Sequence, residues 1–172
     1  MTKPLVTGVG QVCIVAKDCD ATMKQLFEVA GIGPWAVWTP FLTNMRVRGV
    51  EAPYSMKLAM AWTKGFSWEV IQPLEGPSIY REFLEEKGEG VHHVLIENAN
   101  HSYEETIAEA TKKGCPPSME GHWAGVDFAY LETEGPLKVV LEIFRRPPGH
   151  RRPAPDYWYP YAGELPEGTA ND

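Results

Sequence analysis

Two glutamates and a pair of histidines stand out in this sequence because they interrupt runs of apolar residues. Glu69 lies in SWEVI and Glu142 in VVLEIF, while His92 and His93 open the run VHHVLIE. A carboxylate inside an apolar strand costs several kcal/mol unless a cation or a proton compensates it. Carboxylates and imidazole together suit divalent ions such as Zn, Mn, Co, Ni or Mg. The conjunction indicates a buried metal site, although either glutamate alone would be ordinary on a solvent-facing strand.

The two histidines cannot both face such a site if they lie on a regular strand. Successive side chains of a strand point to opposite faces of the sheet. We expect His93, which directly precedes Val-x-Ile, to face the site. His92 would then face a helix or solvent and contribute to packing only.

Two similar segments of the chain would position these residues. GVGQVCIV near the N-terminus matches GVHHVLIE in the middle, with Gln11 at the position of His93. We expect an amphipathic helix after each segment, the first following Asp20 and the second capped by Ser102 and Glu105. Each half then offers several extended runs and ends on one of the two glutamate strands.

This order of elements predicts an α+β fold with two β-α-β-β-β modules. The modules span residues 7–74 and 90–147, and a helix within residues 75–89 links them. The tail, residues 148–172, is rich in proline and aromatic side chains. It is too proline-dense for a helix or a central strand and too apolar for a free tail. We therefore expect it to pack on its own subunit or on a partner subunit.

Composition narrows the class of protein. With 172 residues, 44% of them hydrophobic, the chain can build one ordinary domain or two fused modules. The net charge of −7 argues against a nucleic-acid partner. No apolar run approaches the roughly 20 residues of a membrane span, and the N-terminus shows no secretory signal. Three cysteines, an odd number without metal spacing, fit a reduced cytoplasmic protein.

The sequence resembles the vicinal oxygen chelate superfamily, which includes glyoxalase I, methylmalonyl-CoA epimerase, extradiol dioxygenases and bleomycin-resistance proteins. The similarity covers about residues 7–147 and is nearest to the epimerase branch in WEVIQPLEGPSIYREFLEEKGEGVHHVLIE and LKVVLEIFRRP. The resemblance implies that the modules curl into a cupped, barrel-like mixed sheet around a central divalent metal. Carried over position by position, the metal ligands are Gln11, Glu69, His93 and Glu142.

The resemblance also implies a reaction. The metal, which would be Zn, Co, Ni or Mn, would chelate two neighbouring substrate oxygens and stabilise the enolate formed when the α-proton leaves. Glu142 is the expected base. Lys57, in YSMKLAMAW, stands where such epimerases carry a second carboxylate, and we assign it a catalytic role. We thus expect an isomerase, epimerase or lyase that acts as a homodimer on a small molecule, such as an acyl thioester or aromatic compound other than methylmalonyl-CoA.

Two other functions remain open for this fold. One is a metal-free protein that binds or sequesters a small molecule, against which the intact ligand set argues. The other is a metal-dependent dioxygenase or hydrolase, although the two histidines and one carboxylate of an Fe(II) triad are missing. The aromatic residues expected to contact substrate are Trp35, Trp38, Phe128, Tyr130 and Phe144, and Arg46 and Arg48 are candidates for contacting an anionic group.

Overall fold

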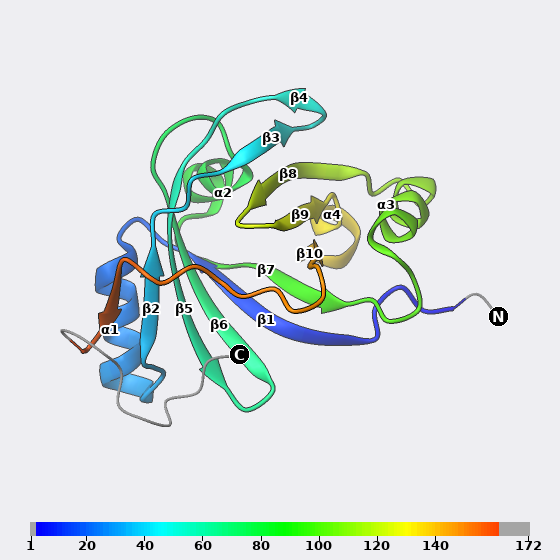
Figure 1. The fold of residues 1–172 in the computed structure, drawn as a ribbon. Coiled ribbons are helices and arrows are strands. Elements are labelled where there is room, and N and C mark those ends of the chain that lie inside the picture. The colour runs from blue at the N-terminus through cyan, green and yellow to red at the C-terminus, as the bar shows by residue number, and fades with distance from the viewer. Residues whose placement is uncertain (1–2, 162–172) are drawn as a thin grey trace.

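The structure, a computed structural model, describes residues 3–161. Within them one curved, unclosed sheet of eleven strands carries four helices, so the predicted α+β class is confirmed (Figure 1). None of the described helices has the length and hydropathy needed to cross a membrane. The strands are β1 (Gly8–Val15), β2 (Trp35–Trp38), β3 (Thr43–Val47), β4 (Val50–Glu51), β5 (Met56–Thr63), β6 (Phe66–Pro73), β7 (Gly90–Glu97), β8 (Pro117–Trp123), β9 (Val126–Leu131), β10 (Val140–Arg145) and β11 (Tyr157–Tyr159). The helices are α1 (Cys19–Ala30), α2 (Ile79–Lys87), α3 (Tyr103–Lys112) and α4 (Glu134–Leu137).

Two equivalent halves of the sheet meet at β1 and β7. The strand order is β11-β2-β5-β6-β1-β7-β10-β9-β8-β3-β4. Outward from the antiparallel β1–β7 pair, the order β1-β6-β5-β2 in one half is matched by β7-β10-β9-β8 in the other. The β1–β6 and β7–β10 pairs are both parallel. An approximate twofold axis between β1 and β7 therefore relates the two halves.

Two segments fall outside this repeat, and the sequence pattern did not predict them as strands. The β3–β4 hairpin is inserted between β2 and β5, yet β3 pairs with β8 of the other half. β11 pairs with the edge strand β2, so the first part of the tail packs on its own chain. Residues 162–172 of the predicted tail lie outside the described residues.

Local capping explains where the main helices begin. Ser78 caps α2, and Ser102 and Glu105 form the predicted capping box of α3. α1 begins earlier than predicted, because the carboxylate of Asp18, rather than Asp20, accepts the N–H of Ala21. A side-chain oxygen in this position satisfies an N–H that the helix leaves without a partner.

The sheet packs apolar residues on both of its faces. On one face α1 covers part of the first half, with Met23, Trp35, Val37 and Ala59 in the contact. α3 covers the second half in the same way, with Ile96, Ala110 and Ile143. The largest cluster fills the cup itself and includes Cys13, Met56, Leu58, Met60, Ile71, Phe128 and Tyr130. The cup therefore combines an apolar wall with the polar residues described next.

Candidate metal centre

Carboxylates from both halves of the sheet meet one imidazole inside the cup. Glu69 on β6, His93 on β7 and Glu142 on β10 each expose at most 5% of their surface. Nε2 of His93 lies 3.1 Å from Oε2 of Glu69 and 3.4 Å from Oε2 of Glu142. The structure thus brings together three of the four predicted ligands.

The register of the four central strands explains this meeting. Two adjacent rows of paired residues cross β6, β1, β7 and β10, and the twofold axis exchanges them. One row is Ser67, Gln11, Leu95 and Glu142, and the other is Glu69, Cys13, His93 and Val140. Gln11 and His93 are therefore equivalent positions, as are Glu69 and Glu142. In each row the predicted ligands alternate with other residues. The first row contributes Gln11 and Glu142, and the second contributes Glu69 and His93.

Gln11 is fully buried in the floor of the cup. The hydroxyl of Ser67 donates to its Oε1 at 3.0 Å, while its Nε2 has no hydrogen-bond partner among the described residues. Rotating the carboxamide by 180° exchanges its oxygen and nitrogen. The amide N–H would then donate to Ser67, and the oxygen would occupy the position without a partner. Gln11 can therefore present an oxygen ligand without moving its backbone.

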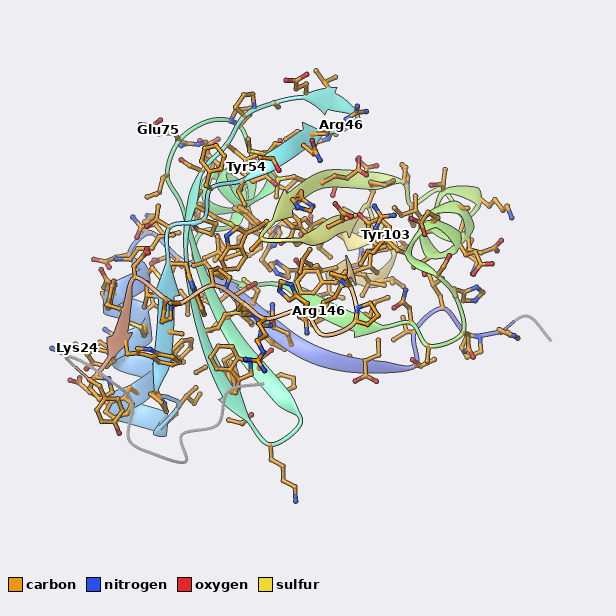
Figure 2. All side chains as sticks on the ribbon, viewed as in Figure 1. Lys24, Arg46, Tyr54, Glu75, Tyr103 and Arg146 are labelled. Carbon is orange, nitrogen blue, oxygen red and sulfur yellow. The ribbon has the colours of Figure 1, made fainter. Side chains whose placement is uncertain are left out.

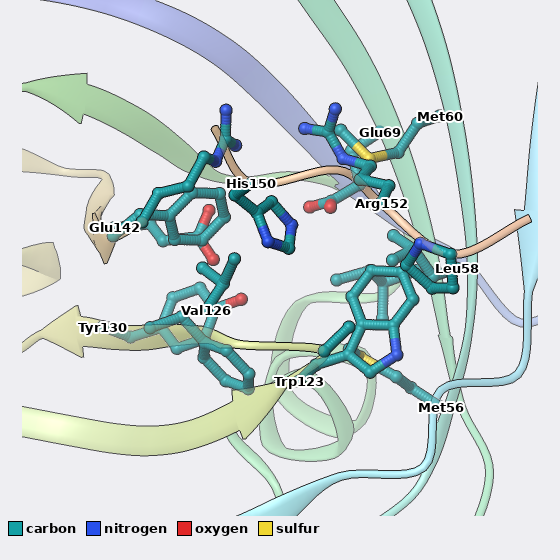
Figure 3. Close-up of a pocket in the computed structure, with 16 residues that line it drawn as sticks. Met56, Leu58, Met60, Glu69, Trp123, Val126, Tyr130, Glu142, His150 and Arg152 are labelled. Carbon is teal, nitrogen blue, oxygen red and sulfur yellow. The ribbon is translucent and has the colours of Figure 1, made fainter. Parts of the chain in front are cut away.

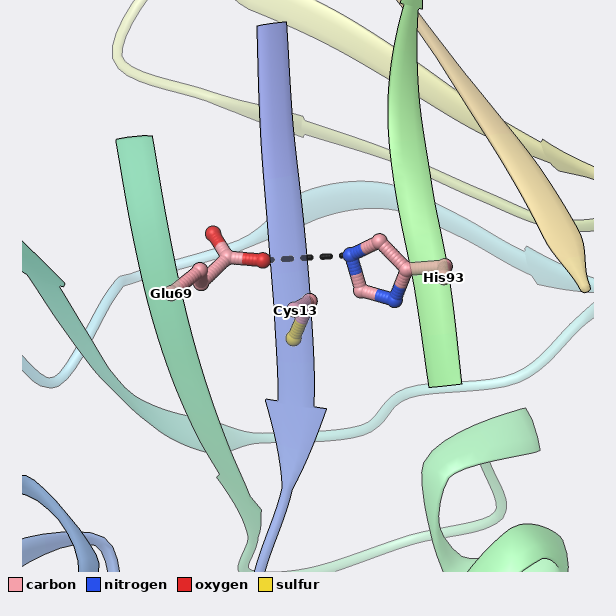
Figure 4. Close-up of side chains that lie close together, drawn as sticks. All are labelled: Cys13, Glu69 and His93. Carbon is pink, nitrogen blue, oxygen red and sulfur yellow. Dashed lines mark hydrogen bonds and ion pairs between the residues drawn. The ribbon is translucent and has the colours of Figure 1, made fainter. Parts of the chain in front are cut away.

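Cys13 is a possible ligand that the sequence analysis did not assign. Its sulfur, a carboxylate oxygen of Glu69 and a ring nitrogen of His93 all lie within 4.8 Å of one another (Figure 4). Burial, followed by the nearby charge of Glu69, raises the pKa of the Cys13 thiol well above its usual value. Because the thiolate is the form that binds metals, a protonated Cys13 is a weak competitor of Gln11.

The charges at this centre are incompletely compensated. Burial alone would lower the pKa of His93, but the carboxylates of Glu142 and Glu69 outweigh it and raise the pKa to about 9. Burial also raises the pKa of Glu142, although His93 opposes this shift. Oε2 of Glu142 has no hydrogen-bond partner in the described chain, since its 3.4 Å contact with His93 is an ion pair only. Together with the free end of Gln11, this oxygen fits a divalent cation as its partner.

His92 does not act as the simple alternation rule predicts. It does face a helix, with its ring centroid 5.0 Å from that of Phe83 in α2. However, β7 carries an extra residue between Val91 and His93 relative to β1, and this bulge brings Nδ1 of His92 to 2.8 Å from Nδ1 of His93. Burial, and then the charge of His93, lowers the pKa of His92 far below its usual value. A neutral His92 can accept the Nδ1 proton of His93, which leaves Nε2 of His93 available as a ligand atom.

Two tyrosines extend the polar network behind Glu142. The hydroxyl of Tyr80 in α2 donates to the hydroxyl of Tyr130 in β9 at 2.7 Å, and both rings are buried. The Tyr130 hydroxyl in turn interacts with Glu142. The sequence pattern gave no sign of Tyr80, because it lies in the linking helix and reaches the site only through the fold.

An apolar cavity opens above the two glutamates. Glu69 and Glu142 line it, and three of the five aromatic residues predicted to contact substrate, Phe128, Tyr130 and Phe144, form part of its wall (Figure 3). The remaining lining residues include Met56, Leu58, Met60, Ile71, Trp123 and Val126. Arg146, His150 and Arg152, which the sequence analysis did not assign to the site, border its opening.

Two of the residues predicted to contact substrate, Trp35 and Trp38, have their side chains away from this cavity. Trp35 belongs to the core between the sheet and α1, where its indole N–H donates to the carbonyl of Ile32. Trp38 packs at the edge of the cup, and its indole N–H donates to the carbonyl of Pro153 at 3.1 Å. Neither tryptophan lines the cavity that contains the glutamates.

Lys57, to which the sequence analysis assigns a catalytic role, does not line the cavity. Met56 and Leu58, its neighbours on β5, line the cavity, so Lys57 projects from the opposite face. There its Nζ lies 2.5 Å from Oδ2 of Asp20 in α1, and 5.3 Å from the ring centroid of Tyr157. Lys57 therefore joins α1 and β11 to the outside of the sheet.

Arg46 and Arg48 also lie away from the cavity. Arg46 is exposed on β3 near the edge of the sheet (Figure 2). The guanidinium of Arg48 forms a two-point ion pair with Glu82 of α2, with N–O distances of 2.8 and 2.7 Å. The structure therefore places neither arginine at this cavity.

Comparison with solved structures finds the same fold in several proteins. The methylmalonyl-CoA epimerase of Mycobacterium tuberculosis matches with a TM-score of 0.57 and 14% identity, covering 86% of this chain and 93% of that chain. A variant of the Streptomyces coelicolor epimerase in complex with 2-nitronate-propionyl-CoA has a TM-score of 0.55 and 19% identity, covering 82% and 98%. A hypothetical protein from Bacillus halodurans has a TM-score of 0.56 and 19% identity, covering 84% and 97%.

Sequence comparison assigns the family. Among curated proteins, comparison gives no match. The family model described as the glyoxalase/bleomycin resistance protein/dioxygenase superfamily matches residues 10–130, which is more than half of the chain and includes Gln11, Glu69 and His93. With its two equivalent half-sheets around a polar centre, this chain belongs to the glyoxalase/bleomycin resistance protein/dioxygenase superfamily.

Proposed function

We propose that this protein is a divalent-metal-dependent isomerase, epimerase or lyase that removes the proton next to a substrate carbonyl. The observation that carries the proposal is the pair of residue rows across the four central strands. They place Gln11, Glu69, His93 and Glu142 at equivalent, buried positions of the two halves. Two of these side chains retain an unsatisfied polar atom among the described residues. Burying such groups is costly, so their retention in an apolar cup supports a role in binding an ion.

The ion would be held by the oxygens of Gln11, Glu69 and Glu142 and by Nε2 of His93. When bound, it would supply Lewis-acid polarisation of a pair of neighbouring substrate oxygens. The protein supplies the proton acceptor, for which Glu142 is the best candidate. Glu142 would leave the ion to accept the proton, and burial, which raises its pKa in the absence of an ion, would make the released carboxylate a stronger base than an exposed glutamate. The Tyr80–Tyr130 pair would hold this carboxylate in place.

The cavity wall bears on the type of reaction. The face of β5 that lines the cavity carries Met56, Leu58 and Met60, so this strand offers no carboxylate where the resembling epimerases have one. This supports a reaction with one principal base and argues against methylmalonyl-CoA itself as the substrate. Because an epimerase of the same fold was solved with 2-nitronate-propionyl-CoA, other acyl thioesters are the first class to test.

A metal-free binding protein is the second candidate, and one contact favours it. The protonated imidazole of His93 already neutralises part of the charge of Glu69 and Glu142. The cup can therefore remain intact around an apolar ligand without an ion. A direct assay of proton removal separates the two functions.

The deciding experiment is exchange of the α-proton of short acyl-CoA thioesters in D₂O, followed by ¹H NMR with and without added Zn or Co. We expect metal-dependent exchange that Glu142→Gln slows by about 100-fold or more, the scale of a lost general base. Lys57→Gln serves as the matched control and should exchange at the wild-type rate. Metal binding without exchange of any thioester would contradict the proposed reaction, and tight binding without metal would favour the second candidate.

A further inference from the structure

The chain crosses the open side of the cup after β10 as an extended segment, residues 146–156, which we call the strap (Figure 1). The indole N–H of Trp38 donates to the carbonyls of Pro153 and Ala154 at 3.1 and 3.2 Å. Oδ2 of Asp156 accepts the backbone N–H of Thr39 at 2.7 Å, and β11 then continues along β2. The far end of the strap is therefore fixed to the edge of the sheet, and its side chains have defined positions over the cup.

Three basic side chains of the strap gather at the cavity opening. Arg146, His150 and Arg152 border the cavity that contains Glu69 and Glu142, and they also border an adjoining groove along β1 and β6. In the view of Figure 3 the ring of His150 lies between the carboxylates of Glu142 and Glu69, and Arg152 lies beside Glu69; Arg146 lies near the centre of the molecule in Figure 2. The same three basic side chains are therefore shared by the two cavities.

Aromatic rings orient the two guanidinium groups. The guanidinium carbon of Arg146 lies 5.7 Å from the ring centroid of Phe144, and that of Arg152 lies 5.2 Å from the ring centroid of Trp62. The guanidinium of Arg146, stacked in this way, keeps its N–H donors directed outward in its own plane, where they can form bidentate bonds to an oxyanion. Arg146 has no ion-pair partner among residues 3–161.

The basic groups lie close enough to influence one another. Burial, and then the charges of Arg146 and Arg152, lowers the pKa of His150. The nearest acids of the cavity, Glu69 and Glu142, pair with His93. Positive charges at the opening of an apolar cavity attract the anionic end of a ligand.

We propose that Arg146 and Arg152 bind an oxyanion, a carboxylate or a phosphate, at one end of a substrate whose apolar body fills the cavity. The apolar wall of Met56, Leu58 and Phe128 takes the body, and the strap fixes the charged end. This specificity site lies beyond residue 130, where the match to the family model ends. The anion site defines a class of substrate for the same cup. The inference rests on the proposed function only because it takes the bound ligand to be the substrate.

The test is calorimetric titration of the full chain with three ligands that share a phenylalkyl body. These are 4-phenylbutanoate, its neutral primary amide and 2-phenylethyl phosphate. Each titration is run with and without a chelator, so that direct binding of the anion to a metal is separated from binding by the strap. The variants are Arg146→Gln and Arg152→Gln, singly and together, with Arg151→Gln as the matched control. Arg151 carries the same charge on the same strap but lines a different groove.

We expect the wild type to bind at least one anion at least tenfold more tightly than the amide, with or without the chelator. Each Arg→Gln change should weaken that binding by about tenfold and the double change by about 100-fold, the scale of charge-assisted hydrogen bonds. The amide should be affected by less than about twofold, and Arg151→Gln should have no effect. A preference for butanoate or for phosphate identifies which anion the site takes.

The inference is overturned if the amide binds as well as both anions, if neither anion binds at millimolar concentration, or if the double variant binds like the wild type. A lysine pair, Arg146→Lys with Arg152→Lys, should retain most of the affinity, which separates loss of charge from a change in packing. Metal titration of the same double glutamine variant should be unchanged. Failure of metal binding in the wild type would instead count against the proposed function and leave the anion result standing.

Discussion

Nδ1 of His92 lies 2.8 Å from Nδ1 of His93, although the two residues are neighbours on one strand. A regular strand would direct them to opposite faces. The bulge in β7 instead turns His92 into a partner of His93 while its ring still packs against α2. This contact determines which nitrogen of His93 is available to an ion.

Substitution of the two histidines should therefore give graded losses of metal affinity. His93→Ala removes a ligand and should abolish measurable binding of Zn or Co. His92→Ala removes only the acceptor for Nδ1 of His93 and should weaken binding by about tenfold, the lower range for a group behind a ligand. His92→Phe, which restores packing but not the nitrogen, should behave like His92→Ala. Binding that is lost with His92→Ala but kept with His93→Ala would contradict this assignment.

The choice between Gln11 and Cys13 as the fourth ligand can be tested by spectroscopy. Gln11→Leu should weaken cobalt binding by at least about tenfold, whereas Cys13→Ala should leave the affinity within about twofold of the wild type. We expect the Co(II) spectrum to lack a thiolate charge-transfer band, because burial and the neighbouring Glu69 disfavour deprotonation of the Cys13 thiol. Such a band, lost with Cys13→Ala, would make Cys13 the ligand instead.

Lys57 should matter for stability alone. Its ion pair with Asp20 is partly exposed, with 21% of the lysine side chain and 52% of the aspartate side chain accessible, so the solvent screens it. Lys57→Gln should lower the free energy of unfolding by at most about 1 kcal/mol, the upper range for such pairs. Metal affinity should be unchanged in a Co(II) titration of the same variant. A loss of metal affinity in Lys57→Gln would instead support the role at the site that the sequence predicts for Lys57.

Tyr80 should affect proton transfer more than metal binding. Tyr80→Phe removes the hydroxyl that donates to Tyr130, at a cost of about 1 kcal/mol of folding stability. Since Tyr130 in turn contacts Glu142, we expect slower α-proton exchange with little change in metal affinity. Tyr54→Phe is a useful control, because the Tyr54 hydroxyl donates to the carbonyl of Glu120 instead. Equal effects of both changes on exchange would argue against a specific role of Tyr80.

The sequence alone predicts the polar centre well, for a physical reason. Glu69, His93 and Glu142 are noticeable because burying such groups in apolar strands requires compensation. The repeat around Gln11 and His93 likewise predicts how the halves correspond. Side-chain caps such as Ser78 and Ser102 are local and therefore readable from short patterns.

The features that the sequence did not predict depend on which face of a strand a side chain occupies and on contacts between distant parts of the chain. β5 is apolar on both faces, with Met56 and Leu58 toward the cavity and Ala59 toward α1, so alternation could not tell which face carries Lys57. The same ambiguity affects β2, whose four residues are all buried. The strap follows the second module in sequence, and only the pairing of the next segment, β11, with β2 carries the arginines of the strap across the cup.

The most direct test of the account is the metal stoichiometry of chelator-treated protein, measured by equilibrium titration with Co(II) and Zn(II). We expect about one ion per chain and a rise in the thermal midpoint on loading, because an ion that binds the folded state stabilises it. Glu69→Gln with Glu142→Gln should remove both effects. A wild-type protein that binds neither ion, or a double variant that binds them as tightly as the wild type, would contradict the metal centre.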